Sequence, residues 1–281
     1  MMEIVSTVKE LQSILSSARK LGTVGFVPTM GALHHGHISL VNQSVGENRY
    51  TVVSIFVNPT QFNDKKDLER YPRDLSKDAQ LLDNTNCDLI FAPSVDEMYP
   101  EPDTRQFDFG NLGTVMEGKH RPGHFNGVGQ IVSKLFDIVQ PDKAYFGLKD
   151  FQQLAIIKKL VKDFNYNIDI IPCQIIREKD GLAMSSRNVL IESDVRKETP
   201  VIYRILKEAK NKYSSTELGE MYLFVKNEFQ KLKFLKLEYF EIVDDETLME
   251  VTEIPTNRPC SACVAVFAGK VRLIDNIQFN S

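Results

Sequence analysis

Short apolar runs alternate with amphipathic segments along the first two thirds of the sequence. The runs are bounded by proline, glycine or polar residues, as expected of strands buried within a sheet. The segments between them repeat apolar side chains every three or four residues, the spacing of a helix with one buried face. The expected strands are residues 24–27, 51–57, 88–92, 144–146 and 168–176. The expected helices are residues 6–20, 74–84, 128–139 and 151–164.

This alternation predicts a parallel sheet with helices on both faces, in which ligands bind beyond the carboxyl ends of the strands. Beyond Ser193 the pattern changes. Two helices, at 194–211 and 216–232, precede strands near 237–243, 262–267 and 270–275. We therefore expect an α/β protein. A Rossmann-like parallel-sheet domain should span residues 1–180, and a smaller C-terminal α/β lid domain should span residues 181–281.

The first strand leads into a turn and a helix that carry three histidines between residues 34 and 37. Pro28 should end the strand, because proline lacks a ladder donor. His34 and His37 then fall in the first turn of the helix, where unpaired N–H groups favour phosphate, and Gly36 allows a ligand to approach the backbone. The pattern is also compatible with surface histidines or with two ligands of a metal.

Composition narrows the range of partners. The chain has 281 residues and a net charge of −4, which disfavours a general nucleic-acid binder. It has no apolar run of transmembrane length and no signal-peptide pattern at its start, so we expect a cytoplasmic protein that binds no membrane. The four cysteines are too scattered for a disulfide framework, and Cys260 and Cys263 are expected to be buried thiols.

Two irregular stretches are candidates for function. Residues 93–126 lack clear periodicity, and a long structureless loop inside a compact domain is usually functional. Residues 180–187 are polar, contain Gly181 and lie between the expected domains. We expect this second stretch to act as a lid.

Six motifs occur in order along the chain and together resemble one enzyme family. His34, Gly36 and His37 match the HxGH signature of the nucleotidyltransferase superfamily. The longer set resembles the pantothenate synthetase (pantoate:β-alanine ligase) family of that superfamily. The motifs are residues 28–37, 56–62, 71–73, 121–125, 146–153 and 180–187.

The resemblance implies an ATP-dependent condensation of (R)-pantoate with β-alanine. ATP and pantoate would form an enzyme-bound pantoyl adenylate and pyrophosphate, and attack by β-alanine would release pantothenate and AMP. The family also implies magnesium on the phosphates and a homodimer. The magnesium ligands are open, with Asp78 and Asp150 as candidate acidic contacts.

The resemblance also assigns residues. His37, the family's proton donor, would be catalytic together with His34 and Lys149. Gln61 and Gln153 would bind pantoate, and Gln61 would also lie near β-alanine. Without the resemblance, the two glutamines would be read as surface polar residues. The ATP site would consist of Met30, Gly31, Ala32, Leu33, His34, His35, Gly36, His37, Gly147, Leu148, Lys149, Asp150, Ile176, Met184, Ser185, Ser186 and Arg187.

Two other functions compete with this interpretation. Another HxGH nucleotidyltransferase could adenylylate a phosphate instead of a carboxylate, but this leaves the paired glutamines unexplained. A nucleotide-sensing or RNA-binding module could keep the fold without the chemistry, but the negative net charge counts against RNA.

Overall fold

The computed structural model describes residues 2–212, 218–253 and 258–279 and contains a six-stranded and a three-stranded sheet. The larger sheet is parallel, with strand order β1-β4-β3-β2-β5-β6. It is the expected Rossmann-like sheet, extended by an edge strand that the sequence pattern did not indicate. Its strands are β1 (Glu3–Val5), β2 (Val24–Thr29), β3 (Tyr50–Ile55), β4 (Leu89–Phe91), β5 (Lys143–Gly147) and β6 (Asp169–Cys173).

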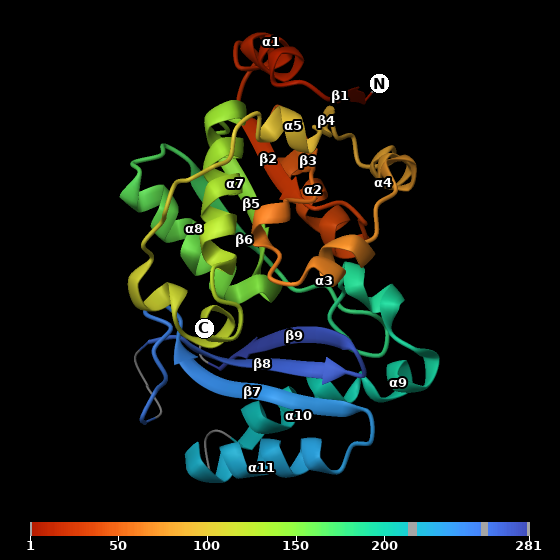
Figure 1. Cartoon of the computed structure of the whole chain (residues 1–281), viewed down its shortest axis with the longest axis vertical. Coiled ribbons are helices and arrows are strands. Elements are labelled where there is room, and N and C mark those ends of the chain that lie inside the picture. Colours follow the sequence, from red (N-terminus) through yellow and green to blue (C-terminus); the bar gives the residue numbers. More distant parts are fainter. Residues whose placement is uncertain (1, 213–217, 254–257, 280–281) are drawn as a thin grey trace.

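Helices cover both faces of this sheet (Figure 1). Neighbouring strand residues point to opposite faces, so the apolar side chains on each face need a layer of helices to bury them. Phe26 belongs to a core with side chains from residues 8–18, 124–139 and 151–163, whereas Val27, on the other face, belongs to a core with side chains from residues 35–47 and 75–82. The helices are α1 (Val8–Ala18), α2 (His35–Glu47), α3 (Lys65–Arg70), α4 (Leu75–Leu82), α5 (Val95–Met98), α6 (Met116–His120), α7 (His124–Val139) and α8 (Phe151–Asp163). Short 3₁₀ turns are η1 (Pro59–Gln61), η2 (Gly110–Gly113) and η3 (Leu148–Asp150).

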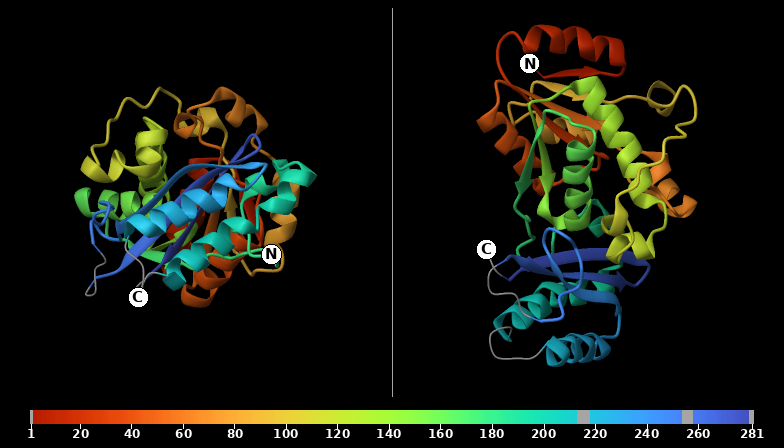
Figure 2. Two further views of the ribbon diagram at one scale, coloured as in Figure 1. Left: turned by 90° about the horizontal axis from the view of Figure 1, so that it is seen from below. Right: turned by 90° about the vertical axis from the view of Figure 1, so that its left-hand side faces the viewer.

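The C-terminal part forms a second layer below the carboxyl ends of the parallel strands (Figures 1 and 2). Its antiparallel sheet has the order β7-β8-β9, and α10 and α11 pack against the sheet face that points away from the first domain. Its elements are η4 (Ser186–Leu190), α9 (Ser193–Glu198), α10 (Val201–Lys212), α11 (Leu218–Gln230), β7 (Leu235–Asp244), β8 (Cys260–Ala268) and β9 (Val271–Gln278).

The helix expected over 194–211 is two helices. The chain breaks between α9 and α10 around Pro200, because proline cannot donate a helical hydrogen bond. The expected start of the next helix, at residue 216, lies outside the described residues.

The prediction that Pro28 ends the first strand is wrong. Pairing of β2 with β3 continues to Thr29, whose carbonyl accepts a hydrogen bond from the Phe56 N–H at 3.1 Å. Thr29 therefore faces β3, and Pro28, one residue earlier, faces the β5 side. Pairing with β5 already stops at Phe26, so no ladder bond needs the missing donor.

The stretch 93–126 is not structureless. It contains α5, η2 and α6, and α7 begins at His124, four residues before the expected start. Helices α5 and α6 and the turn η2 are too short for the helical period to show in a sequence window. Gly123 has φ 82° immediately before α7, a conformation that glycine adopts without strain, and this fixes where the helix begins.

Two further expectations concern the cysteines and membrane spans. The four cysteines are buried thiols. In the described parts of the chain, no helix combines the length and apolarity needed to cross a membrane.

Candidate active site

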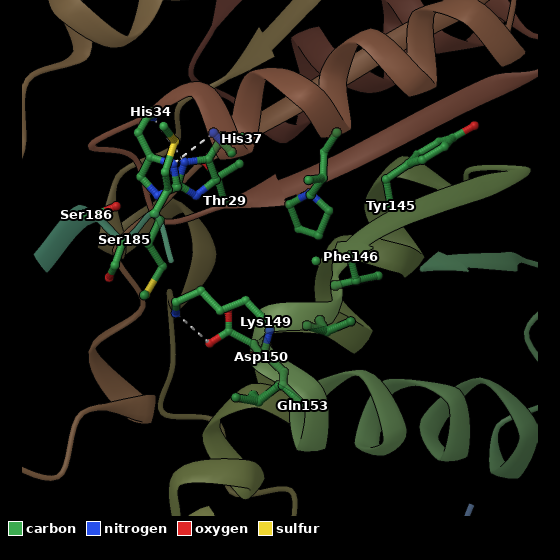
Figure 3. Close-up of a pocket in the computed structure, with 18 of the residues that line it drawn as sticks. Thr29, His34, His37, Tyr145, Phe146, Lys149, Asp150, Gln153, Ser185 and Ser186 are labelled. Carbon is green, nitrogen blue, oxygen red and sulfur yellow. Dashed lines mark hydrogen bonds and ion pairs between the residues drawn. The ribbon is translucent and has the colours of Figure 1, made fainter. Parts of the chain in front are cut away.

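A cavity of about 220 Å³ lies at the carboxyl ends of β2 and β5. Its walls come from the turn after β2, from η1, η3 and α7, and from residues 184–187 at the entry to the C-terminal part. Figure 3 shows the two histidines and the two serines on one side of this space, with Lys149, Asp150 and Gln153 on the other. The carboxyl edge of a parallel sheet is where ligands of such folds bind.

Asp78 holds the turn between β2 and α2. Gly31 and Ala32 both have positive φ, and the Asp78 carboxylate accepts hydrogen bonds from the N–H groups of Ala32 at 3.0 Å and Leu33 at 2.7 Å. Asp78 is only 2% exposed. Both of its oxygens therefore fix the turn. Asp78 does not line the cavity, which favours Asp150 over Asp78 as the acidic contact for magnesium.

The two site histidines lock each other at the start of α2. His34 is the N-cap, and its Nδ1 accepts from the Gly36 N–H at 3.1 Å. The His37 Nδ1 accepts from the His34 N–H at 3.3 Å, and the ring centroids are 4.1 Å apart. Because each Nδ1 is an acceptor, each neutral ring carries its proton on Nε2. The pair therefore offers two N–H donors beside the helix N-terminus.

Burial and a neighbouring cation keep both rings neutral in the ligand-free protein. Burial, followed by the positive charge of Lys149, lowers the pKa of His34 to about 4. The pKa of His37 lies well below its usual value, because the ring is buried and then because His34 and Lys149 are close. An anion bound here would remove part of this penalty. The site is thus electrostatically poised for a phosphate.

Gln61 is held in place by its surroundings. The Asn58 Nδ2 donates to its Oε1 at 3.2 Å, and the His124 Nδ1 donates to its backbone carbonyl at 2.8 Å. Its own Nε2 lies 2.9 Å from the Met30 sulfur, a weak acceptor. The carboxamide N–H groups therefore keep capacity to bind a carboxylate in the cavity.

Lys149 and Gln153 lie on the opposite wall, on η3 and the first turn of α8. The Lys149 Nζ is 3.8 Å from an Asp150 carboxylate oxygen, and its side chain is 19% exposed. The positive charge is therefore only loosely paired and is available to a ligand. Gln153 lines this cavity and also a small chamber beside it that contains Arg121 and His124.

Residues 176–187 close the site from the C-terminal side. The Met184 N–H donates to the Ile176 carbonyl at 3.0 Å, and the Ser186 Oγ donates to the Ala32 carbonyl at 2.9 Å. Arg187 pairs with Asp67 at 2.9 Å and lies over the Tyr71 ring, 5.3 Å from its centroid. The segment thus packs directly on the histidine turn.

Most of the residues expected in the site line the cavity, but not all. The structure brings together Met30, His34, Gly36, His37, Gln61, Gly147, Lys149, Asp150, Gln153, Ile176, Met184, Ser185, Ser186 and Arg187. It does not bring in Gly31, Ala32, Leu33, His35 and Leu148. His35 is exposed, Leu33 packs into the core beside α2, and Gly31 and Ala32 form the turn that Asp78 holds.

Sequence reasoning missed the apolar wall of the cavity. Val128, Ile131, Val132 and Leu135 of α7 line it, although their spacing indicated only a buried helix face. The apolar stripe of α7 is continuous. Its C-terminal end, at Phe136 and Val139, lies in the core, whereas the four residues nearer its N-terminus also line the cavity. Tyr71, beneath Arg187, was visible only as part of a motif.

The residues available for a divalent cation are few. No group of three or more His, Cys, Asp or Glu side chains that could hold a metal ion occurs in the described part of the chain. Asp150 is the carboxylate that lines the cavity. This donor set suits an ion held mainly by a ligand's phosphates, as magnesium often is, and not an all-protein metal cage.

Comparison with known proteins identifies a single family. Residues 3–278 match the family model described as pantoate-β-alanine ligase. A pantothenate synthetase of Bacteroides thetaiotaomicron is 53% identical over 279 residues, covering 99% of both chains. One of Porphyromonas gingivalis is 50% identical, with the same coverage.

Solved structures agree in fold over the whole chain. A pantothenate synthetase of Thermus thermophilus superposes with a TM-score of 0.93 at 40% identity, covering 100% of both chains. A pantoate-β-alanine ligase of Francisella tularensis, described as complexed with β-γ ATP and β-alanine, gives 0.84 at 38% identity and covers 100% of this chain and 99% of that one.

Proposed function

The chain belongs to the pantoate-β-alanine ligase family, and we propose that it joins its substrates through a pantoyl adenylate formed in the cavity at the end of β2. The protein is an ATP-dependent ligase of pantoate and β-alanine, an enzyme of pantothenate biosynthesis. One observation carries the adenylate proposal. Two imidazole N–H donors and Lys149 converge on the same space as Gln61 and Gln153, so phosphate and carboxylate can meet there.

Amide formation between a carboxylate and an ammonium is uphill in neutral water, so the acid is activated first. A pantoate carboxylate oxygen attacks the α-phosphorus of ATP, and the bond to the β-phosphate oxygen breaks with loss of pyrophosphate. The β-alanine amine then attacks the carbonyl carbon, and AMP leaves. The substrate supplies the nucleophile, so no covalent enzyme intermediate is needed.

The residues of the cavity position ATP and pantoate for adenylation and stabilise the negative charge on the phosphates. The His34 and His37 N–H groups donate to phosphate oxygens at the N-terminus of α2, and Lys149 offsets charge from the opposite wall. Ser185, Ser186 and Arg187 add donors on the C-terminal side. Negative charge beside the rings raises the pKa of both histidines, so ATP binding and protonation of His37 are coupled.

Gln61 and Gln153 orient the pantoate carboxylate through amide N–H groups. A bidentate arginine would hold the carboxylate more tightly but would blunt it as a nucleophile. The apolar α7 wall is suited to the carbon skeleton of pantoate. β-Alanine then approaches beside Gln61, from the chamber that contains Arg121 and His124.

Magnesium belongs to the same proposal. Asp150, the carboxylate that lines the cavity, would be the protein contact of the ion, and the ion would offset negative charge on the phosphates and on the leaving pyrophosphate. The donor chemistry of the cavity fits this role.

Product analysis tests the proposed reaction. With ATP, magnesium, pantoate and β-alanine all present, steady-state turnover should give AMP and pyrophosphate, and omission of any one of the four should stop it. Detection of ADP and phosphate in place of AMP would mean that a phosphoryl group, not an adenylyl group, is transferred.

We further propose that residues 180–187 form a lid that shields the adenylate from water. The segment rests on the histidine turn through Ser186, so ligands under it add contacts that hold it closed. Tryptic cleavage after Arg187 should therefore slow strongly when ATP and pantoate are both bound. Cleavage at equal rates with and without the two ligands would exclude a lid.

Three expectations remain proposals. We place the domain boundary near residue 180, between the last parallel strand and the C-terminal helices. The cytoplasmic location is proposed from the sequence pattern alone. The homodimer rests on the family resemblance, and sedimentation of the purified protein would test it.

A further inference from the structure

Strand β9 of the C-terminal sheet reaches across to the turn that carries Lys149. The Asn276 Nδ2 donates hydrogen bonds to the backbone carbonyls of Leu148 at 2.8 Å and Lys149 at 3.0 Å. Asn276 is 7% exposed, so these bonds form away from bulk water. One side chain of the C-terminal domain thus fixes two successive peptide groups in the wall of the cavity.

Side-chain capping does not hold the turn. Among the described residues, Asp150 at the start of α8 makes no side-chain capping hydrogen bond, and Gly147 at the start of η3 has no side chain to make one. Among the residues that the structure describes, the Lys149 ammonium pairs only with Asp150, at 3.8 Å, and the Asp150 side chain is 50% exposed. The backbone position of Lys149 therefore depends on Asn276 more than on its own side chain.

Asn276 is itself held firmly. Its N–H donates to the Asp275 Oδ1 at 2.8 Å, and Asp275 accepts two hydrogen bonds from the Arg177 guanidinium, at 2.6 and 2.9 Å. Arg177 in turn lies over the Tyr203 ring, 3.5 Å from its centroid. The ion pair of Asp275 with Arg177, packed on the Tyr203 ring, therefore holds the Asn276 carboxamide in the orientation that reaches η3. Such a second layer of contacts is what keeps a functional residue in place.

We infer that Asn276 is a positioning residue for adenylation, acting through the backbone of Lys149. The C-terminal domain must be seated on η3 for the Lys149 ammonium to reach the triphosphate. This inference rests on the proposed role of Lys149. Asn276 lines the small chamber that contains Arg121 and His124, but not the cavity where ATP is proposed to bind, so a role in adenylation must act through Lys149.

Asn276→Ala tests the inference, with Gln278→Ala as the matched control. Gln278 lies on the same strand, but its amide donates to Asp245, in the turn that follows β7. The single-turnover adenylation rate of Asn276→Ala should fall about 10- to 100-fold, the loss expected from a misplacement near 1 Å, while the KM for pantoate changes little. Gln278→Ala should adenylate at the normal rate. Equal rates in the two variants would overturn the inference.

A readout in the ligand-free protein separates positioning from general damage. The charge of Lys149 helps to lower the pKa of His34, after burial of the ring. If Asn276→Ala lets Lys149 move away, an NMR titration should show the pKa of His34 shifted upward, whereas Gln278→Ala should leave it unchanged. Asp150, Glu178, His35 and His37 also face or influence this pair of rings, and none is altered in either variant. An unchanged His34 pKa in Asn276→Ala would contradict the inference.

A double-mutant cycle distinguishes failure of this inference from failure of the proposed Lys149 role. If Asn276 acts through Lys149, adding Asn276→Ala to Lys149→Ala should slow adenylation less than twofold further, because coupled residues are not additive. Fully multiplicative losses would show that Asn276 acts by another route and would overturn the inference. Normal adenylation by Lys149→Ala alone would instead show that Lys149 has no role in adenylation. The His34 titration would then decide whether Asn276 holds Lys149 in position.

Discussion

Gln153→Glu is expected to lower the affinity for pantoate about 1,000-fold while ATP affinity stays within a few fold. The substitution keeps the shape of the side chain but places a second negative charge beside the substrate carboxylate. At ~4 Å and an effective dielectric constant of ~20, the repulsion is about 4 kcal/mol. Calorimetric titration of each ligand into the variant measures both affinities.

Two controls separate charge from shape and from global effects. Gln153→Met keeps the volume without the charge and should bind pantoate more tightly than Gln153→Glu. Gln12→Glu makes the same change on the exposed side of α1, far from the cavity, and should bind both substrates normally (Figure 1). Unchanged pantoate affinity in Gln153→Glu would remove Gln153 from the substrate site.

Lys149→Ala should slow adenylation about 100-fold or more and weaken pantoate binding far less. The lost contact is charge-assisted and is strongest when charge builds on the phosphates, so about 3 kcal/mol is lost mainly in the transition state. His37→Ala should behave alike, because it removes a donor from the other side of the same phosphates. Single-turnover rates with saturating ATP and pantoate measure the effect.

Lys162→Ala is the matched control for this prediction. Lys162 is an exposed cation in the last turn of the same helix, α8, so its removal changes the net charge equally without touching the cavity. Its adenylation rate should be normal. If Lys149→Ala instead adenylates normally and is slow only in amide formation, Lys149 serves the second step and the assignment is wrong.

The sequence predicted the parts of the site that depend on local order. The strand, glycine turn and helix around His34 and His37 lie next to each other in the chain, and a short apolar run gives way to the helical period of 3.6 within a few residues. The η3 junction after β5 follows the same logic. Gln61 was assigned from the family resemblance, and it lies in the site because parallel strands β2 and β3 bring the loops that follow them to one edge of the sheet.

What the sequence did not predict depends on short elements and on distant contacts. The edge strand β1 has three residues and α6 has five, too few for a period to appear. Pro28 could remain in a strand only because β5 stops pairing before it, which no local pattern encodes. The contact of Asn276 with η3 joins residues 127 and 128 positions apart, so it emerges only when the two domains pack.

The most direct test of the account is exchange of labelled pyrophosphate into ATP. The central claim is that pantoate and ATP react in this cavity to form an acyl adenylate before β-alanine enters. Exchange should therefore occur with enzyme, magnesium, ATP and pantoate in the absence of β-alanine, and it should stop when pantoate is omitted. Exchange that requires β-alanine, or that proceeds without pantoate, would contradict a pantoyl adenylate intermediate.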